Sequence, residues 1–183
     1  MPVCSPLFRL VCVLLLILLS AAFFAFGSPE WLLGESLADI LFYQVLLDEA
    51  RYAEAGLVLD RLLASGGGAS YFFCLEAEYS FTMLAHTFPG DWMARAGRAT
   101  DRAMQAEGDE KNWRARQNRA LWLKFSFRYD EALTLLSPAL CDPTAPVSLL
   151  YLALEIAVAL ESEEFCGFIL DSLRARGELD DDE

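Results

Sequence analysis

One short phrase occurs twice in this sequence, as RYAEA at residues 51–55 and as RYDEA at residues 128–132. A leucine-rich run follows each copy, LVLDRLLA after the first and LTLLSPAL after the second. A tyrosine, an acid and a small alanine at fixed offsets, between two apolar runs with helical spacing, indicate a corner between packed helices. The duplication predicts repeated helix pairs, because each pair exposes apolar faces that only neighbouring pairs can cover.

Turn signals divide the rest of the chain into helix-length segments. The clearest are the glycine run at residues 66–68, Pro89-Gly90 and Asp142-Pro143, since glycine and proline are costly inside a helix. No segment alternates like a strand, so we predict an all-α fold. The expected helices run from Ser28 to a corner at Ala50-Arg51, and over residues 52–64, 70–87, 92–106, 112–126, 130–140, 147–160 and 164–174.

The spacing of small residues supports the repeat. If Ala55, Ala96, Ala132 and Phe168 occupy equivalent places, the intervals are 41, 36 and 36 residues. Periods in this range are typical of solenoids built from helix pairs. Phe168 is the weakest member of the series, because a small residue is expected there.

The body of the chain, over roughly residues 35–175, resembles a set of tetratricopeptide repeats. The matching residues are Tyr52, Glu54, Ala55 and Leu59 in the first unit, Gly90-Asp91-Trp92 in the second, and Tyr129, Glu131, Ala132, Leu136, Ala139 and Asp142-Pro143 in the third. The first helices lack the tryptophan-leucine-glycine pattern, and Arg119 stands where a buried leucine is expected. The resemblance implies a short α-solenoid of about four antiparallel helix pairs over residues 28–177, and a protein that binds other proteins.

The two ends differ from the body. Arg9 precedes an uncharged apolar stretch, residues 10–27, which has the pattern of a secretory signal peptide and is also just long enough for a membrane anchor. Under both interpretations of residues 1–27, the body lies outside the cytoplasm, and we expect a bacterial periplasm. Residues 178–183 hold five acids and are expected to form a solvated tail.

Charge and cysteine content argue against a nucleic-acid-binding protein and against a fold stabilised by disulfides. The formal net charge of −13 makes nucleic acid a poor partner, although residues 95–128 carry nine of the 14 cations. The odd set Cys74, Cys141 and Cys166 is a poor disulfide framework, so we expect three buried thiols.

Few residues in the sequence could catalyse a reaction or bind a metal or cofactor. His86 is the only histidine, so a hydrolytic triad or a zinc site has little to draw on. The glycine run at 66–68 lacks the Gly-Lys-Ser/Thr sequence of a phosphate-binding loop. We therefore expect no catalytic residue, no cofactor and no metal.

Two surfaces are candidate binding sites. Arg95, Arg98 and Arg102 share one face of a predicted helix and could meet an acidic partner, anionic lipid or the acidic tail; the alternative is a solvated face. The second candidate site is a groove along the first helices of the pairs. The alternative is that the aromatic residues assigned to this groove are buried in the core. The expected residues of the groove are Gln44, Glu78, Phe81, Phe88, Arg114, Gln117 and Lys124.

The leading hypothesis is a non-enzymatic scaffold of the cell envelope that binds a protein partner through this groove or the arginine face. The alternative is a periplasmic helical protein that binds a small or apolar ligand and could serve a transporter. That alternative predicts a closed pocket near Phe81, Phe88 and Leu121.

Overall fold

A computed structural model describes residues 31–65, 69–106 and 112–179, and this part of the chain contains eight helices and no strand. The predicted all-α fold is confirmed. The helices are α2 (Trp31–Asp48), α3 (Tyr52–Ser65), α4 (Ser70–Ala85), α5 (Trp92–Ala106), α6 (Trp113–Phe125), α7 (Tyr129–Cys141), α8 (Val147–Ala159) and α9 (Glu163–Ala175). The expected signal or anchor at residues 1–27 and the last four tail residues lie outside the described residues. Within the described ranges, no helix combines the length and the apolar character needed to cross a membrane.

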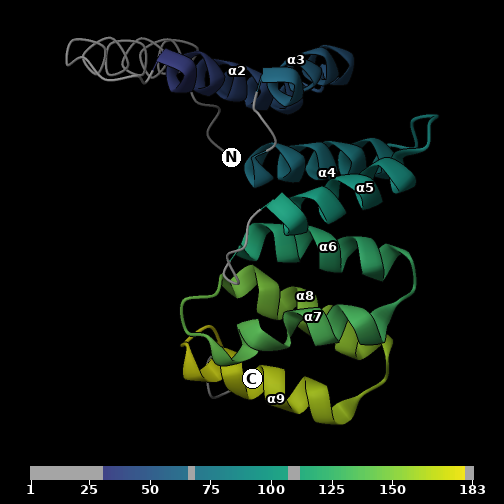
Figure 1. The fold of residues 1–183 in the computed structure, drawn as a ribbon. Helices are drawn as coiled ribbons and strands as arrows, with labels where there is room; N and C mark the ends of the chain where they lie inside the picture. The colour runs from purple at the N-terminus through teal and green to yellow at the C-terminus, as the bar shows by residue number, and fades with distance from the viewer. Residues whose placement is uncertain (1–30, 66–68, 107–111, 180–183) are drawn as a thin grey trace, which may run out of the picture. The chain divides into compact units, whose positions relative to one another are not determined.

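The chain divides within α3 into two compact units, one ending at Val58 and the other beginning at Leu59. In the second unit, each helix from α4 to α9 packs against the next one along the chain. The first helices of the hairpins also pack against one another, α4 on α6 and α6 on α8, while α7 packs on α9. The hairpins are therefore stacked in chain order, with the α4–α5, α6–α7 and α8–α9 corners at the same edge (Figure 1).

Four corners share one backbone geometry. Their central residues, Ala50, Thr87, Phe127 and Glu161, have φ between 54° and 58°, which few residues other than glycine adopt. Each of these amides donates to the carbonyl three residues back, at 3.0 Å. The next amide donates to the carbonyl five residues back, at 2.8–3.1 Å, in the pairs Arg51–Leu46, Phe88–Met83, Arg128–Leu123 and Ser162–Ala157. This pattern closes a helix in a Schellman motif.

The repeated phrase is explained by these corners. Arg51 forks onto Glu54 at 2.8 and 2.6 Å, and Arg128 forks onto Glu131 at 2.6 and 2.5 Å. Each arginine thereby links the corner to the first turn of the next helix. The alanine of each copy, at positions 55 and 132, is fully buried.

The predicted register of the fourth unit is wrong. Phe168 is half-exposed, and Cys166 occupies the place of the buried alanines. The Cys166 amide bonds to the carbonyl of the residue after the corner, as Ala55 and Ala132 do. The thiols also differ from expectation: none of the three forms a disulfide within the described residues, but Cys141 is exposed and Cys166 is half-buried, so only Cys74 is the buried residue predicted.

The apolar core lies mainly among α7, α8 and α9. Its fully buried large side chains include Leu136, Leu149, Leu150, Ile156, Ile169 and Leu173. Burial of one such side chain contributes about 1.5–3 kcal/mol. Pro138 lies inside α7 and has no amide for the Thr134 carbonyl, but the Ser137 hydroxyl donates to that oxygen at 2.9 Å.

Candidate functional site

The first helices of the second unit carry a chain of polar contacts from α4 to α6. The guanidinium of Arg114 on α6 donates to both carboxylate oxygens of Glu78 on α4, at 2.7 and 2.6 Å. Asn118 adds a donor to Glu78 at 3.2 Å. The hydrogen bond to Glu78 is the main cause of a raised Arg114 pKa. Arg114 also lies over the Tyr71 ring, 4.8 Å from its centre.

The same face continues from α6 to α8. Lys124 pairs with Glu155, and the Ser148 hydroxyl donates to Gln117 at 3.4 Å. The rings of Phe81 and Phe125 lie 5.8 Å apart. The helices that the sequence analysis predicted to line a groove are therefore linked by contacts between side chains.

Seven residues were predicted for this groove, and two of them, Glu78 and Arg114, contact each other. Phe81, Gln117 and Lys124 instead contact residues of the neighbouring first helix that were not predicted, namely Phe125, Ser148 and Glu155. Gln44 is exposed on α2 in the first unit. Phe88 is exposed at the corner after α4, where its ring lies 6.3 Å from that of His86. The charged groove residues are in ion pairs, Arg114 with Glu78 and Lys124 with Glu155, which the sequence did not indicate.

The arginines of α5 lie around a carboxylate that the sequence analysis did not single out. Glu76 on α4 is only 8% exposed. Arg95 Nε lies 2.9 Å from its Oε1 and Arg102 Nη1 lies 3.9 Å from its Oε2, an oxygen that accepts no hydrogen bond from the described residues. Arg98 is exposed and has no ion pair with any described residue. The one feature of the sequence that could have indicated this site is an acidic residue, Glu76, after the mainly apolar first turns of α4.

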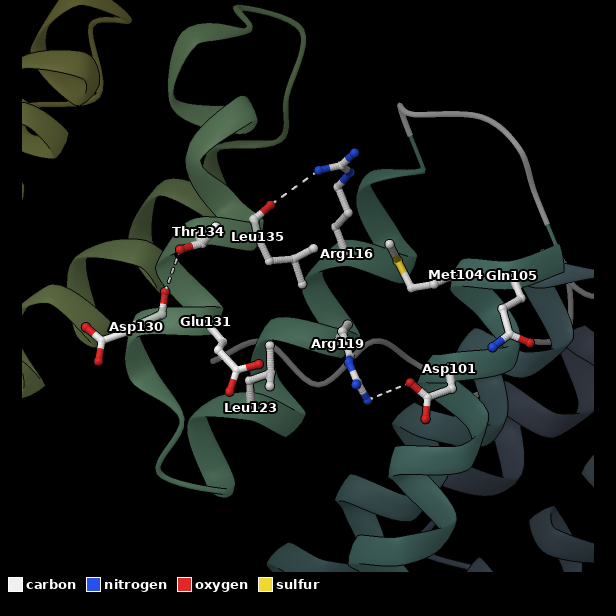
Figure 2. Close-up of a pocket in the computed structure, with 10 residues that line it drawn as sticks. All are labelled: Asp101, Met104, Gln105, Arg116, Arg119, Leu123, Asp130, Glu131, Thr134 and Leu135. Atoms are coloured by element: carbon white, nitrogen blue, oxygen red, sulfur yellow. Dashed lines mark hydrogen bonds and ion pairs between the residues drawn. The ribbon is translucent and has the colours of Figure 1, made fainter.

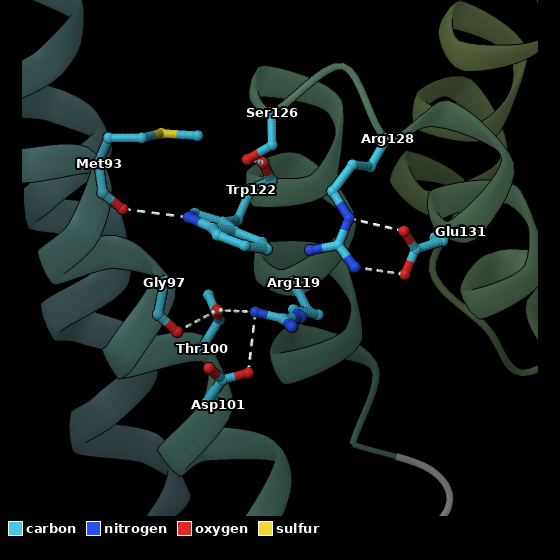
Figure 3. A network of polar contacts seen from close by, with 9 residues as sticks. All are labelled: Met93, Gly97, Thr100, Asp101, Arg119, Trp122, Ser126, Arg128 and Glu131. Atoms are coloured by element: carbon cyan, nitrogen blue, oxygen red, sulfur yellow. Dashed lines mark hydrogen bonds and ion pairs between the residues drawn. The ribbon is translucent and has the colours of Figure 1, made fainter.

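Trp122 joins α5 to α6 (Figure 3). Its indole Nε1 donates to the Met93 carbonyl at 3.0 Å. The guanidiniums of Arg119 and Arg128 lie 4.3 and 5.6 Å from its ring, within the range of cation–π attraction. A Cβ on Gly97 would lie 2.8 Å from that Nε1, so the indole requires a glycine on α5. Arg119, expected at a leucine position, is accommodated by stacking on the indole.

A pocket of about 630 Å³ lies between α5 and α7 with α6 as its floor (Figure 2). Arg119 crosses it to Asp101 at 2.8 Å, and Arg116 donates to the Leu135 carbonyl at 3.3 Å. The cations of this region are evident in the sequence, but the helix faces that Arg116 and Arg119 occupy are not. The lining residues are Asp101, Met104, Gln105, Arg116, Arg119, Leu123, Asp130, Glu131, Thr134 and Leu135.

The described residues contain no cluster of histidine, cysteine and acidic side chains that could hold a metal ion. His86 lies exposed at the C-terminal cap of α4. Comparison with protein-family models, with curated proteins and with solved structures found no match to this chain.

Proposed function

We propose that this chain is a non-enzymatic scaffold of the cell envelope, built from tetratricopeptide-like helix pairs, which binds another protein. The observation that carries the proposal is the stacking of α4, α6 and α8, joined by Glu78–Arg114 and Lys124–Glu155. Stacked helix pairs present an extended face, and such faces commonly bind polypeptides. The envelope location follows from Arg9 and the apolar residues 10–27.

The exposed aromatic residues of this face indicate what a partner would contact. Tyr71, Phe125 and Tyr151 are 39%, 50% and 42% exposed. The charges beside them are paired, so a partner gains little from them and more from covering these rings. Aromatic residues are enriched among the side chains that dominate binding energy at protein interfaces. We therefore expect an apolar or aromatic segment of the partner to lie along α4, α6 and α8.

The small-ligand alternative has less support. It was motivated by Phe81, Phe88 and Leu121, and none of these residues lines the pocket between α5 and α7. The structure therefore does not place the three residues that motivated this alternative in one enclosed site. The protein partner is therefore the function that we propose.

Site-specific photo-crosslinking in the native membrane fraction tests the proposal. A photoreactive residue at Tyr151 should give one dominant protein adduct, identified by mass spectrometry. The matched control is Asp171, an exposed position on α9, which should give none. No adduct, or the same set of adducts from both positions, would contradict the proposal. The same spectra would show whether residues 1–27 remain in the mature protein.

A further inference from the structure

We propose that the exposed end of the α8–α9 hairpin binds an amphipathic helix of a protein partner, with a basic residue in the last turn of that helix. The inference rests on the proposed function insofar as it requires a protein partner. It adds a second contact surface and states the secondary structure and the charge of the segment that fits it.

The α6–α7 and α8–α9 hairpins correspond residue by residue. Each helix boundary of the second hairpin lies 34 residues after the matching boundary of the first. The corner hydrogen bonds have the same offset, since the Arg128 amide donates to the Leu123 carbonyl and the Ser162 amide to the Ala157 carbonyl. The residues of α6 and α7 that meet the next helix therefore identify the positions on α8 and α9 where a further helix would pack.

On α8, these positions are apolar and exposed. Gln117 and Lys124 of α6 form polar contacts with α8. The corresponding residues of α8 are Tyr151 and Val158, which are 42% and 61% exposed. Two polar side chains that contact the following helix are thus replaced by an aromatic and an aliphatic one, which lie open to solvent.

On α9, the corresponding surface has an opening. Leu133 and Leu136 of α7 are buried in the core that α7 shares with α8. Their counterparts on α9 are Gly167, which is exposed, and Leu170, which is half-buried. A Cβ on Gly167 would meet nothing within 4 Å, so the backbone of another helix could approach closely here. Gly167 and Leu170, together with the two residues of α8, form the end face of the hairpin.

The described chain after α9 is held against the segment between α7 and α8. Arg176 donates to the carbonyls of Ala139, Asp142 and Ala145, and Leu179 packs on the core. α9 forms the last layer of the second unit (Figure 1), and the residues described after it, up to 179, form no further helix. Terminal pairs of a helical-repeat stack need a polar outer face to stay soluble, so an apolar end face indicates a partner.

The fold itself indicates that the occupant is a helix. α6 packs on both helices of the α4–α5 hairpin, and α8 packs on both helices of the α6–α7 hairpin. A partner helix on α8 and α9 would repeat this arrangement. The first helices all end at the edge where the corners lie (Figure 1), so a partner helix with the same direction would end there too, beside the start of α9.

Glu163 determines the charge that fits. It is exposed in the first turn of α9 and forms no ion pair with a described residue. Its counterpart Tyr129 packs against the core, so Glu163 borders the end face. Arg174, in the last turn of α9, already pairs with Asp171 at 3.0 Å. A base in the last turn of the partner helix would face Glu163, and cations are favourable at that end of a helix.

The same charges disfavour a second copy of this chain as the occupant. The formal net charge is −13, and a high net charge of one sign keeps proteins monomeric through repulsion. A partner with basic residues gains from these charges instead.

The test adds designed peptides to the full chain in detergent and maps photo-crosslinks by mass spectrometry. Two blocked helical peptides have the length of α8, 13 residues, with leucines along one face and a photoreactive leucine at the centre. One peptide has lysines in its last turn and the other has glutamates. The lysine peptide should form adducts on α8 and α9, in higher yield than the glutamate peptide.

Two pairs of variants test the end face. Val158→Ser should lower the adduct yield of the lysine peptide about fivefold, because it removes apolar contact area. Val45→Ser, the same change at an exposed valine of α2, should leave the yield unchanged. Glu163→Lys should lower the yield of the lysine peptide about threefold and raise that of the glutamate peptide by a similar factor, as expected for one exposed ion pair. Asp130→Lys, at an exposed position of α7, should change neither.

Circular dichroism melting checks the fold of each variant; if Val158→Ser unfolds, the Glu163→Lys exchange decides by itself. Equal losses in Val158→Ser and Val45→Ser, adducts outside α8 and α9, or a lysine peptide no better than the glutamate peptide would overturn the inference. A dimer of the parent that Val158→Ser dissociates, measured by light scattering, would also overturn it, because a second copy would then occupy the end face. A dominant protein adduct from a photoreactive residue at Phe125, on the first-helix face, would in those cases leave the scaffold proposal standing.

Discussion

The first and last helices of the second unit are held together by different means. Every buried polar or charged residue in the described part of the chain lies in α4, α5 or α6: Ser70, Glu76, Ser80, Thr100 and Asn118. The helices from α7 to α9 instead bury leucine and isoleucine. Hydrogen bonds have directional requirements and apolar contacts do not. The first half therefore specifies how its helices meet, and the second half buries more of the large aliphatic side chains.

Small residues explain why polar contacts dominate the first half. α5 buries Ala96, Gly97, Ala99, Thr100 and Ala103, which lets neighbouring backbones approach. Side chains then reach carbonyls of the facing helix, as Ser70 does to Ala103 at 2.9 Å and Asn118 to Cys74 at 3.2 Å.

The largest expected effect tests the apolar half. Ile156 is fully buried on α8, and Val158, two residues later, is exposed. Ile156→Ala should lower the free energy of unfolding by about 2–5 kcal/mol, because it leaves a cavity. Val158→Ala should change it by less than about 0.5 kcal/mol. Urea denaturation followed by circular dichroism measures both, and equal losses would mean that α8 does not pack as described.

Replacing a glycine by alanine should lower the stability in the first half and raise it in the second. A Cβ at Gly97 would lie 2.8 Å from Trp122 Nε1, whereas a Cβ at Gly167 on α9 would meet nothing within 4 Å. We expect Gly97→Ala to destabilise by about 1–3 kcal/mol through overpacking. Gly167→Ala should stabilise by up to about 1 kcal/mol, because alanine is the better helix former. Stabilisation by both variants in thermal melts would show that Trp122 does not restrict α5.

The corners should behave alike in both halves, because their strain is local. Thr87 and Glu161 both have a left-handed backbone, which costs a residue with a Cβ about 1–2 kcal/mol. Glycine removes that cost but loses about 0.5–1 kcal/mol of entropy on folding, so each change to glycine should stabilise by roughly 0.5–1 kcal/mol. Gly177, with φ of 71°, is the reverse control, since Gly177→Ala should destabilise. A gain in stability at only one of the two corners would show that the packing around a corner also determines the effect of the glycine.

The smallest effect concerns pH. The hydrogen bond from Arg128 holds the pKa of Glu131 below its ordinary value, and Arg51 does the same for Glu54. A carboxyl whose pKa is lower when folded stabilises the fold above its ordinary pKa, and this contribution is lost as pH falls through the lowered value. Carbon-detected NMR titration should show the Glu131 midpoint rising in Arg128→Gln while that of Glu54 stays constant. An unchanged Glu131 midpoint would contradict the bidentate contact.

Local patterns identified the helices and the repeated corner, but not their surroundings. Breakers such as Pro89-Gly90 are effective whatever packs around them, so the helix bounds were close to those observed. Phe168 was misplaced because an interval cannot distinguish two positions two residues apart; the backbone hydrogen bond after the corner assigns the position to Cys166. Cys141 was predicted to be buried from its residue type, yet it ends α7 on the surface.

The candidate surfaces were predicted only in part. Counting along the first helices placed Glu78, Arg114, Gln117 and Lys124 on one face, since helical spacing is a local property. Their pairing could not be foreseen, because Glu78 and Arg114 are on different helices and meet only when α4 packs on α6. The contacts of Glu76 with Arg95 and Arg102 likewise depend on which helices become neighbours, and so does the pocket between α5 and α7.

By itself, the sequence determined an all-helical chain, the positions of its turns and the alanine corners, because glycine, proline and apolar spacing act within a few residues. Only the tertiary structure decided which charges neutralise one another, that Trp122 lies against Gly97, and that Arg119 pairs with Asp101 at the pocket between α5 and α7. These outcomes depend on contacts between residues far apart in the chain, and such contacts are set by how helices stack.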